Sequence, residues 1–407
     1  MLKGFLVALA LVVLGNHAQA DAVGPRFQVN THKKNWQYRS AVAALADGDF
    51  VVTWMSDGQD GSYSGIFGQR FNNSGSPVGL EFQVNTSWKQ QQVGPSVAGL
   101  ADGGFIVTWQ SFDASGRAIF GQRYDAAGKR KGVEFRISTT ATEEQRLPSV
   151  AGLRDGGFVV VWFLDNVESS ASIYSSTIVG QRFTATGVRA GEQFKVGNAV
   201  QDSFSYSSPQ VSRLTNGGFV VTWVSQTASA YYVKAQRYNA NGAPAGSILK
   251  IAAVPASDTQ GVTGPRVVGL QKGRFVIVWN DFNYTESSAG TFGRRYTSDG
   301  LAAGSKFKIN TTAGSHHSAV AALASGGFVV TYVAETINLA DGVFGQRYSE
   351  GALPTGGELS VSAPSAGLGQ RDPSAAGLQN GGFVFTWTEP EPVFDNYDGI
   401  FGQRFSP

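Results

Sequence analysis

The sequence predicts an all-β fold, a seven-bladed β-propeller with four antiparallel strands in each blade. One observation is a pattern of four short apolar runs, seen most clearly between Pro95 and Thr139. A second is the return of that pattern every ~50 residues along the chain, the spacing typical of propeller blades. A third is the order of the strands at the two ends of the chain, which favours a closed ring.

The four runs of one repeat each have the composition of a β-strand. Ser96–Leu100 and Phe105–Trp109 flank an Asp-Gly turn, a strong hairpin signal because Gly tolerates positive φ. Ile119–Tyr124 and Glu134–Ile137 are joined by another Gly-containing turn. The second and third runs are apolar with little polar alternation, which indicates a sheet buried on both faces and therefore flanked by similar sheets. We refer to the four strands of a repeat as a, b, c and d.

Two sequence markers count the repeats. The triplet GGF, with variants, begins at Gly48, Gly103, Gly156, Gly217, Gly273, Gly326 and Gly381. The tetrad FGQR, with variants, begins at Phe67, Phe120, Val179, Lys234, Phe292, Phe344 and Phe401. Both markers occur seven times and predict seven blades. The alternative is a linear β-solenoid, whose repeats would usually be shorter and whose ends would need caps.

The ends of the chain predict how the ring closes. Phe27–Thr31 reads FQVNT and matches the strand d sequence Glu81–Thr86, EFQVNT. After Phe401–Phe405, a strand c, no further strand d follows. We expect Phe27–Thr31 to pair with Phe401–Phe405 and to complete the seventh sheet, since a ring removes its two free edges.

The predicted strands also distinguish two faces of the ring. Strand a is rich in small apolar residues, which suit the crowded centre, so it is expected to be innermost. The a–b and c–d turns are short and uniform, whereas the b–c and d–a connections vary in length and lie together on the other face. We call the latter the loop-rich face. Function concentrates on loops held by a rigid scaffold, so this face is the expected binding face.

Residues 1–20 are expected to be a secretory signal peptide, and residues 21–407 the propeller. Lys3 precedes the apolar run Phe5–Leu14, and Ala18-Gln19-Ala20 supplies a small-x-small cleavage pattern. The run is too short to span a membrane. Secretion or export to the periplasm is therefore expected, with no membrane span. The chain has no Cys, so no disulfide stabilises the fold. Its formal net charge of +2 argues against nucleic acid as a partner.

Aromatic residues in the variable connections are the candidate ligand-binding residues. Exposed aromatic rings mark carbohydrate or protein contacts, although packing onto the base of a loop is an equally good explanation. The candidates are Trp36, Tyr63, Trp88, Tyr231, Tyr232, Tyr284 and Tyr397.

Two residues recur in nearly every repeat, a Trp at the end of strand b and an Arg at the end of strand c. The Trp could stack on a sugar between blades, and the Arg could bind a carboxylate or a sugar hydroxyl. Their regularity favours structural roles instead. We expect the Trp to pack against the adjoining blade and the Arg to bind backbone carbonyls or an acid of a neighbouring blade.

No metal site or catalytic motif stands out. Asp57–Gly61 and Asp395–Gly399 carry oxygen ligands that Ca²⁺ could use, but neither has the spacing of a full calcium loop, so turns are expected and no cofactor is predicted. His316 and His317 are adjacent in the sequence, but adjacency alone does not form a metal site. No GxSxG, HExxH, P-loop or CxxC sequence is present. The absence of these motifs favours binding over catalysis only weakly, because propeller active sites are assembled from separate loops and leave no local motif.

The consensus DGGFVVTW…GIFGQRF…EFQVNT resembles tandem repeats of secreted and cell-surface bacterial proteins, including large calcium-binding adhesin-like chains. The resemblance covers about residues 26–405 and implies no particular ligand or reaction. This chain departs from the large adhesins because it lacks their GGxGxD calcium arrays, and it also lacks the DxDxDG loops of integrin-type propellers.

Together these patterns predict a secreted, non-catalytic recognition module that binds carbohydrate or a cell-surface ligand through its loop-rich face. One alternative is a propeller enzyme, a lyase or hydrolase, with its site at the mouth of the central channel. Another is a scaffold for protein partners, which a flat exposed apolar patch would favour.

Overall fold

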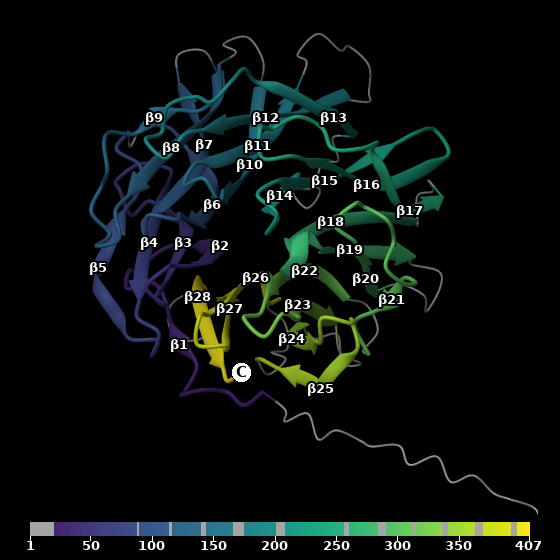
Figure 1. Ribbon diagram of the computed structural model, residues 1–407. Helices are drawn as coiled ribbons and strands as arrows, with labels where there is room; N and C mark the ends of the chain where they lie inside the picture. Colours follow the sequence, from purple (N-terminus) through teal and green to yellow (C-terminus); the bar gives the residue numbers. More distant parts are fainter. Residues whose placement is uncertain are drawn as a thin grey trace, which may run out of the picture.

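The computed structural model is a ring of seven sheets, each of four antiparallel strands, as predicted (Figure 1). It describes residues 20–87, 89–113, 116–139, 144–165, 175–200, 208–255, 260–283, 290–311, 315–335, 341–362, 369–391 and 397–407. Blades 1 to 6 are the sheets β2–β5, β6–β9, β10–β13, β14–β17, β18–β21 and β22–β25, and blade 7 combines β26–β28 with β1. In the described part of the chain, no helix is long and apolar enough to cross a bilayer.

Blades 1 to 6 present their strands in sequence order from the centre of the ring outwards, and blade 7 presents β26, β27 and β28 followed by β1. The innermost strands are β2 (Gln37–Ala44), β6 (Gln92–Gly99), β10 (Glu144–Gly152), β14 (Gln210–Arg213), β18 (Gln260–Gly269), β22 (Ser315–Ala322) and β26 (Arg371–Gly377). The second strands are β3 (Phe50–Asp57), β7 (Phe105–Asp113), β11 (Phe158–Asp165), β15 (Phe219–Gln226), β19 (Phe275–Asn283), β23 (Phe328–Glu335) and β27 (Phe383–Pro390).

The outer half of each blade has the same order. The third strands are β4 (Ser64–Phe71), β8 (Gly116–Tyr124), β12 (Ser175–Phe183), β16 (Ala230–Tyr238), β20 (Gly290–Tyr296), β24 (Asp341–Tyr348) and β28 (Asp398–Phe405). The outermost strands are β1 (Phe27–Gln28), β5 (Pro77–Gln83), β9 (Phe135–Arg136), β13 (Phe194–Val200), β17 (Leu249–Pro255), β21 (Phe307–Lys308) and β25 (Pro354–Ser360).

The N-terminal strand closes the ring. β1 pairs with β28, with Phe27 opposite Gly402 and Gln28 opposite Phe401. Asn30 Oδ1 accepts the backbone N–H of Ile400 at 2.8 Å, as Asn85 does from Ile66 at 2.7 Å inside blade 1. The closing contact therefore has the hydrogen-bonding pattern of an ordinary blade, and the predicted closure is confirmed.

The core lies between blades as well as within them. The repeated Trp side chains are buried and belong to apolar clusters shared by adjacent blades; Trp109, for example, packs with Val51 and Ile66 of blade 1. Within every blade, the aromatic residue that begins the second strand stacks on the one that ends the third, with ring centroids 4.5–5.1 Å apart. The Trp residues are structural, as expected.

The centre of the ring is crowded at the level of the inner strands. A Cβ atom added at Gly99, Gly152, Gly269 or Gly377 would lie well inside 3.0 Å of a backbone carbonyl oxygen of the preceding blade's inner strand. Serine hydroxyls add bonds between inner strands: Ser374 accepts the N–H of Val42, and Ser96 that of Val150, both at 3.2 Å. Small residues therefore recur here because neighbouring backbones approach so closely.

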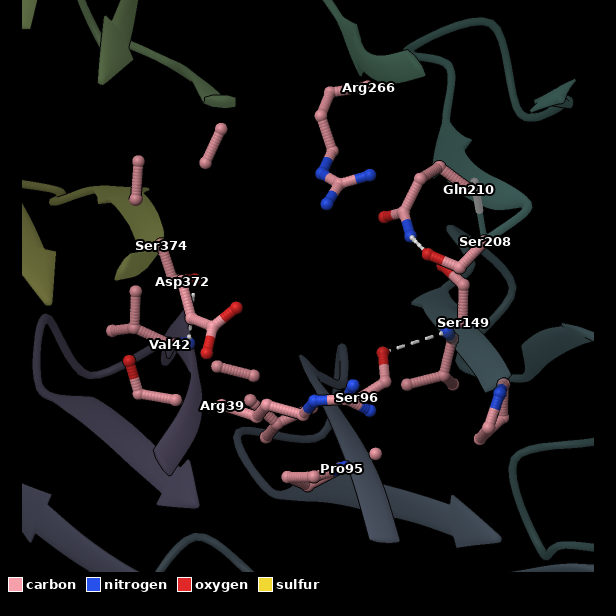
Figure 2. Close-up of a pocket in the computed structure, with 18 of the residues that line it drawn as sticks. Arg39, Val42, Pro95, Ser96, Ser149, Ser208, Gln210, Arg266, Asp372 and Ser374 are labelled. Atoms are coloured by element: carbon pink, nitrogen blue, oxygen red, sulfur yellow. Dashed lines mark hydrogen bonds between the residues drawn. The ribbon is translucent and has the colours of Figure 1, made fainter. Parts of the chain in front are cut away.

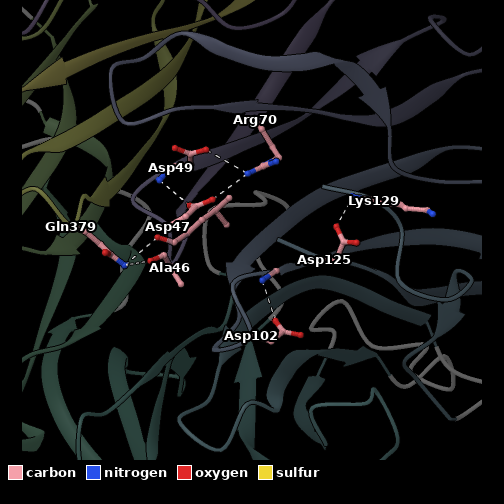
Figure 3. Close-up of polar contacts among 10 residues, drawn as sticks. Ala46, Asp47, Asp49, Arg70, Asp102, Asp125, Lys129 and Gln379 are labelled. Carbon is pink, nitrogen blue, oxygen red and sulfur yellow. Dashed lines mark hydrogen bonds and ion pairs between the residues drawn. The ribbon is translucent and has the colours of Figure 1, made fainter. Parts of the chain in front are cut away.

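The uniform turns form one face of the ring, where the repeated Arg links neighbouring blades. Figure 3 shows this face around Arg70, with its bonds to Asp47 and Asp49. Arg123 donates to the carbonyl of Ala185 in the next blade, and Arg404 donates to that of Ser74 across the closure at 2.5 Å. Two other copies of the repeated Arg bind acids of their own blade: Arg70 binds Asp47 and Asp49 at 3.3 and 3.4 Å, and Arg182 binds Asp155 at 3.1 Å. The predicted structural role agrees with these contacts, but the expectation of acids from a neighbouring blade is wrong for Arg70.

Candidate functional site

Two aromatic side chains meet on the loop-rich face where blade 7 adjoins blade 1. Trp36 lies in the connection from β1 to β2, and Tyr397 lies immediately before β28. Their ring centroids are 6.4 Å apart, with the ring planes at 74°. Trp36 is 53% exposed, a large apolar surface to leave in water. Two candidate residues, distant in sequence, are therefore brought into contact by the closure of the ring.

Tyr63 is another exposed aromatic residue, in a connection that is joined by backbone hydrogen bonds to the connection of Trp36. It lies in the connection from β3 to β4 and is 72% exposed. The Asp57 N–H donates to the Trp36 carbonyl at 3.0 Å and the Gly58 N–H to the Tyr63 carbonyl at 2.5 Å, which ties the two connections together. We call Trp36, Tyr63 and Tyr397 the aromatic patch.

Tyr231 and Tyr232 lie elsewhere than the sequence suggested. The structure places both within β16 rather than in the connection before it, opposite Gln226 and Ser225 of β15. A tight turn at Thr227–Ala230, closed by a 2.8 Å backbone hydrogen bond, makes the b–c connection of blade 4 much shorter than expected. The ring of Tyr231 packs against the apolar core, and the Tyr232 ring lies 5.6 Å from Lys234 Nζ. Neither residue is part of the aromatic patch. Trp88 and Tyr284, the remaining candidates, lie outside the described residues.

The groove between the outer parts of blades 3 and 4 offers little aromatic surface. It has a volume of about 450 Å³ and is lined by Lys195, Lys234, Ile248 and Trp223 among others. Trp223 is only 1% exposed, because its ring packs on Gly197 and its Nε1 donates to the Asn198 carbonyl at 3.2 Å. A ligand in this groove could not stack on the indole face.

The acidic turn Asp57–Gly61 is held by internal hydrogen bonds. Asp57 Oδ1 accepts from the Ser64 hydroxyl at 2.6 Å and from the Tyr38 hydroxyl at 3.2 Å, while Asp60 Oδ1 accepts the Ser62 N–H at 3.1 Å. Within the described ranges, no group of three or more His, Cys, Asp or Glu side chains is close enough to hold a metal ion.

A second candidate site is the central channel. The inner strands enclose a pocket of about 290 Å³ lined by residues of all seven blades (Figure 2). Figure 2 shows the side chains of Arg39, Gln210, Arg266 and Asp372 directed into it from four different blades. An adjoining cavity of about 30 Å³ shares Arg266 and Asp372 with the channel pocket and reaches His317. Because these residues lie toward the start of each inner strand, the pocket is nearer the loop-rich face.

Backbone bulges direct some of these side chains inward. In six blades the inner strand carries a residue with φ between 47° and 64°, in the left-handed region, namely Arg39, Gly94, Leu147, Gly264, His317 and Asp372. Each of these residues lies at a register shift of its inner strand. The conformation is strained for non-glycine residues, and such strain clusters at functional sites.

Burial in the channel pocket disfavours the charged forms of Asp372 and Arg266. Burial raises the pKa of Asp372 above its ordinary value, although Arg39, Arg371 and Arg266 act in the opposite direction. Burial lowers the pKa of Arg266 to about 10, and Asp372 offsets part of that effect. Burial of the charged form of each group therefore carries a cost in stability.

Replacing Asp372 with Asn should stabilise the protein at neutral pH. A carboxyl pKa that is higher in the folded than in the unfolded state means that ionised Asp372 disfavours folding. The penalty is lost below about pH 4, where the carboxyl is protonated in both states. We expect Asp372→Asn to raise Tm at pH 7 by about 2 °C or more, and the difference from wild type to shrink toward pH 4.

Thermal unfolding at pH 7 and pH 4 measures this effect. Asp125→Asn is the matched control, because Asn72 and Asn239 occupy the equivalent turn position in blades 1 and 4 and make the same bond to the backbone. It should leave Tm nearly unchanged at both pH values. A lower Tm for Asp372→Asn at pH 7 would contradict the expectation.

The channel residues were not among the candidates drawn from the sequence. The signal that could have revealed them is a comparison of the repeats at the start of strand a. Gly94-Pro95, Leu147-Pro148 and Gly264-Pro265 are apolar pairs, whereas the equivalent pairs Arg39-Ser40 and Asp372-Pro373 bring charge to the centre of the ring.

The chain is similar in fold to several solved propellers, while no family model and no curated protein matches its sequence. A protein of unknown function from Dyadobacter fermentans is 11% identical, with a TM-score of 0.52 over 95% of this chain and 99% of that one. An alpha-L-arabinanase of Penicillium chrysogenum, complexed with arabinobiose, is 14% identical, with a TM-score of 0.52 over 77% and 92% of the two chains. A GH93 alpha-L-arabinofuranosidase of Fusarium graminearum, also with arabinobiose, is 11% identical, with a TM-score of 0.50 over 79% and 95%. Such low identities establish a shared propeller fold and nothing further.

Proposed function

We propose that this protein is a secreted, non-catalytic recognition module that binds carbohydrate through the aromatic patch on its loop-rich face. The observation that carries the proposal is the edge-to-face pair of the exposed Trp36 and the partly buried Tyr397, held at the junction of blades 7 and 1. Aromatic rings offer a flat apolar face for the C–H surface of a sugar, and their polar edges tolerate the surrounding water.

The surroundings of the patch support a fixed platform. The Trp36 carbonyl accepts the Asp57 N–H, and the Asn35 side chain donates to the Asp57 carbonyl at 3.2 Å. On the blade 7 side, the Glu391 N–H donates to the Tyr397 carbonyl at 2.7 Å. Because both backbones are anchored, little conformational entropy should be lost when the rings meet a ligand. Arabinobiose in the complexes of two propellers of similar fold makes arabino-oligosaccharides the first ligands to test.

Replacing Trp36 with Ala should weaken carbohydrate binding by about ten-fold or more, since stacking on a large aromatic side chain contributes on the order of 1–3 kcal/mol. Tm should change little because the ring is half exposed. A glycan array of the full chain identifies the ligand, with arabino-oligosaccharides included, and calorimetric titration then compares wild type with Trp36→Ala.

The matched control is Leu301→Ala, which removes an exposed apolar side chain from a c–d turn on the opposite face. It should leave the dissociation constant unchanged. Equal binding by wild type and Trp36→Ala, or an array without any carbohydrate ligand, would refute the proposal.

The observation that favours a second candidate, a glycoside hydrolase, is Asp372 in the channel. A carboxyl whose pKa is raised can serve as a general acid, and most glycoside hydrolases pair such a group with a second carboxylate. Asp372 is the one carboxylate among the described residues that line the channel pocket. Release of reducing sugar from arabinan by wild type, abolished in Asp372→Asn, would favour the hydrolase over the recognition module.

A further inference from the structure

Two long polar side chains in the channel pocket stand at an inner-strand position where the other blades have a small residue. The inner-strand residue that lies opposite the fourth residue of the second strand is Ala41, Ser96, Ser149, Ala319 or Ser374 in five blades. Its equivalents in adjacent blades 4 and 5 are Gln210 and Arg266, long polar side chains that both line the pocket. The serines at this position bond to the next blade's backbone, so Gln210 and Arg266 replace a structural residue type.

The two channel arginines have hydrogen-bonding capacity to spare. A guanidinium carries five N–H donors in a planar fork. The hydrogen bond of the Arg266 guanidinium is a long one, 3.4 Å to the neighbouring Pro265 carbonyl. Among the described residues, neither Arg39 nor Arg266 forms an ion pair, although both influence Asp372 electrostatically. Their guanidiniums therefore face the pocket with donors available to a ligand.

The balance of charge limits which ligand fits. The pocket is lined by two guanidiniums, those of Arg39 and Arg266, and by one carboxylate, that of Asp372. Together they carry one excess positive charge, which suits a monoanion. Asp372 and the Gln210 amide can meet ligand hydroxyl groups, and Asp372 would repel a dianion such as phosphate. A volume of about 290 Å³ is at the small end of ligand pockets and can hold a single sugar ring.

We propose that the channel pocket is a second ligand site that binds a small hydroxylated monocarboxylate, a sugar acid. Arg39 and Arg266 bind the carboxylate, since a guanidinium fork matches its two oxygens. Asp372 and Gln210 bind the hydroxyl groups. The site is distinct from the aromatic patch, so the proposal does not rest on the function proposed above.

The experiment titrates the full chain with D-glucuronate, with D-glucose as the matched neutral sugar and with inorganic phosphate, followed by ligand-observed NMR. We expect D-glucuronate to bind at least about ten-fold more tightly than either of the others. Arg266→Gln and Arg39→Gln should each weaken D-glucuronate binding about ten-fold or more, because each removes charge-assisted hydrogen bonds. Arg213→Gln removes the same charge from an exposed position of β14 and should change nothing.

Trp36→Ala should retain D-glucuronate binding, which separates this site from the aromatic patch. Each variant is first checked by its Tm, and Arg266→Lys, which keeps the charge but not the fork, replaces Arg266→Gln if that variant does not fold. Equal affinity for D-glucuronate and D-glucose would overturn the proposal. Tighter binding of phosphate, or D-glucuronate binding unchanged in both arginine variants, would also overturn it.

Discussion

A chain that begins at His32, without Asp21–Thr31, should lose most of the stability of a chain that begins at Asp21. The deletion removes β1 and with it the buried side chain of Val29 and the half-buried ring of Phe27. Each contributes roughly 1.5–3 kcal/mol by burial. It also leaves one edge of β28 without a partner strand.

Polar contacts across the closure increase the loss. Asn30 bonds to the Ile400 N–H, and Arg26 forms a bidentate pair with Glu389 at 2.7 and 2.8 Å. We expect a total loss of about 5 kcal/mol or more, against a typical domain stability of roughly 5–15 kcal/mol. The uncovered edge of β28 should also promote aggregation.

Differential scanning calorimetry of the two chains, together with light scattering, measures both effects. The chain beginning at Asp21 is the control, because it keeps β1 and differs from the other only by the closing segment. A chain beginning at His32 that melts like the control and stays monomeric would show that the closure contributes little to stability.

Gly152→Ala should be a strongly damaging single-methyl change at the centre of the ring. The added Cβ would lie well inside 3.0 Å of the Gly99 carbonyl oxygen in the adjoining inner strand. The obstacle is backbone, which cannot move aside by changing a rotamer, so two inner strands would have to separate. We expect a loss of about 3 kcal/mol or more, the upper part of the usual range for overpacking.

Gly351→Ala is the matched control for this substitution. Gly351 lies in a c–d turn where the nearest atoms to an added Cβ are 3.4 and 3.9 Å away, and its φ is not in the left-handed region. Chemical denaturation of both variants should show a large loss for Gly152→Ala and almost none for Gly351→Ala. Similar stabilities for the two would mean that the inner strands are not closely packed.

The repeat made the architecture predictable because every blade forms the same four-stranded sheet from the same short sequence pattern. The Asp102-Gly103 turn and the apolar run that follows it predict a hairpin with no knowledge of the rest of the chain. The buried Trp side chains and the arginines that join blades were predictable for the same reason, since regular recurrence indicates a contact that every blade makes. Turn length in blade 4 was not predictable from the run itself, and so Tyr231 and Tyr232 were placed in a connection rather than in β16.

The sequence by itself determined the number of blades, the order of strands and the strand that closes the ring, because these follow from short-range patterns repeated along the chain. Only the tertiary structure brought Trp36 to Tyr397, which are about as far apart in the sequence as the ring allows. It alone also showed that Arg39, Gln210, Arg266 and Asp372 share one channel pocket. The physical reason is that these four side chains come from four different blades, so no local stretch of sequence contains the site.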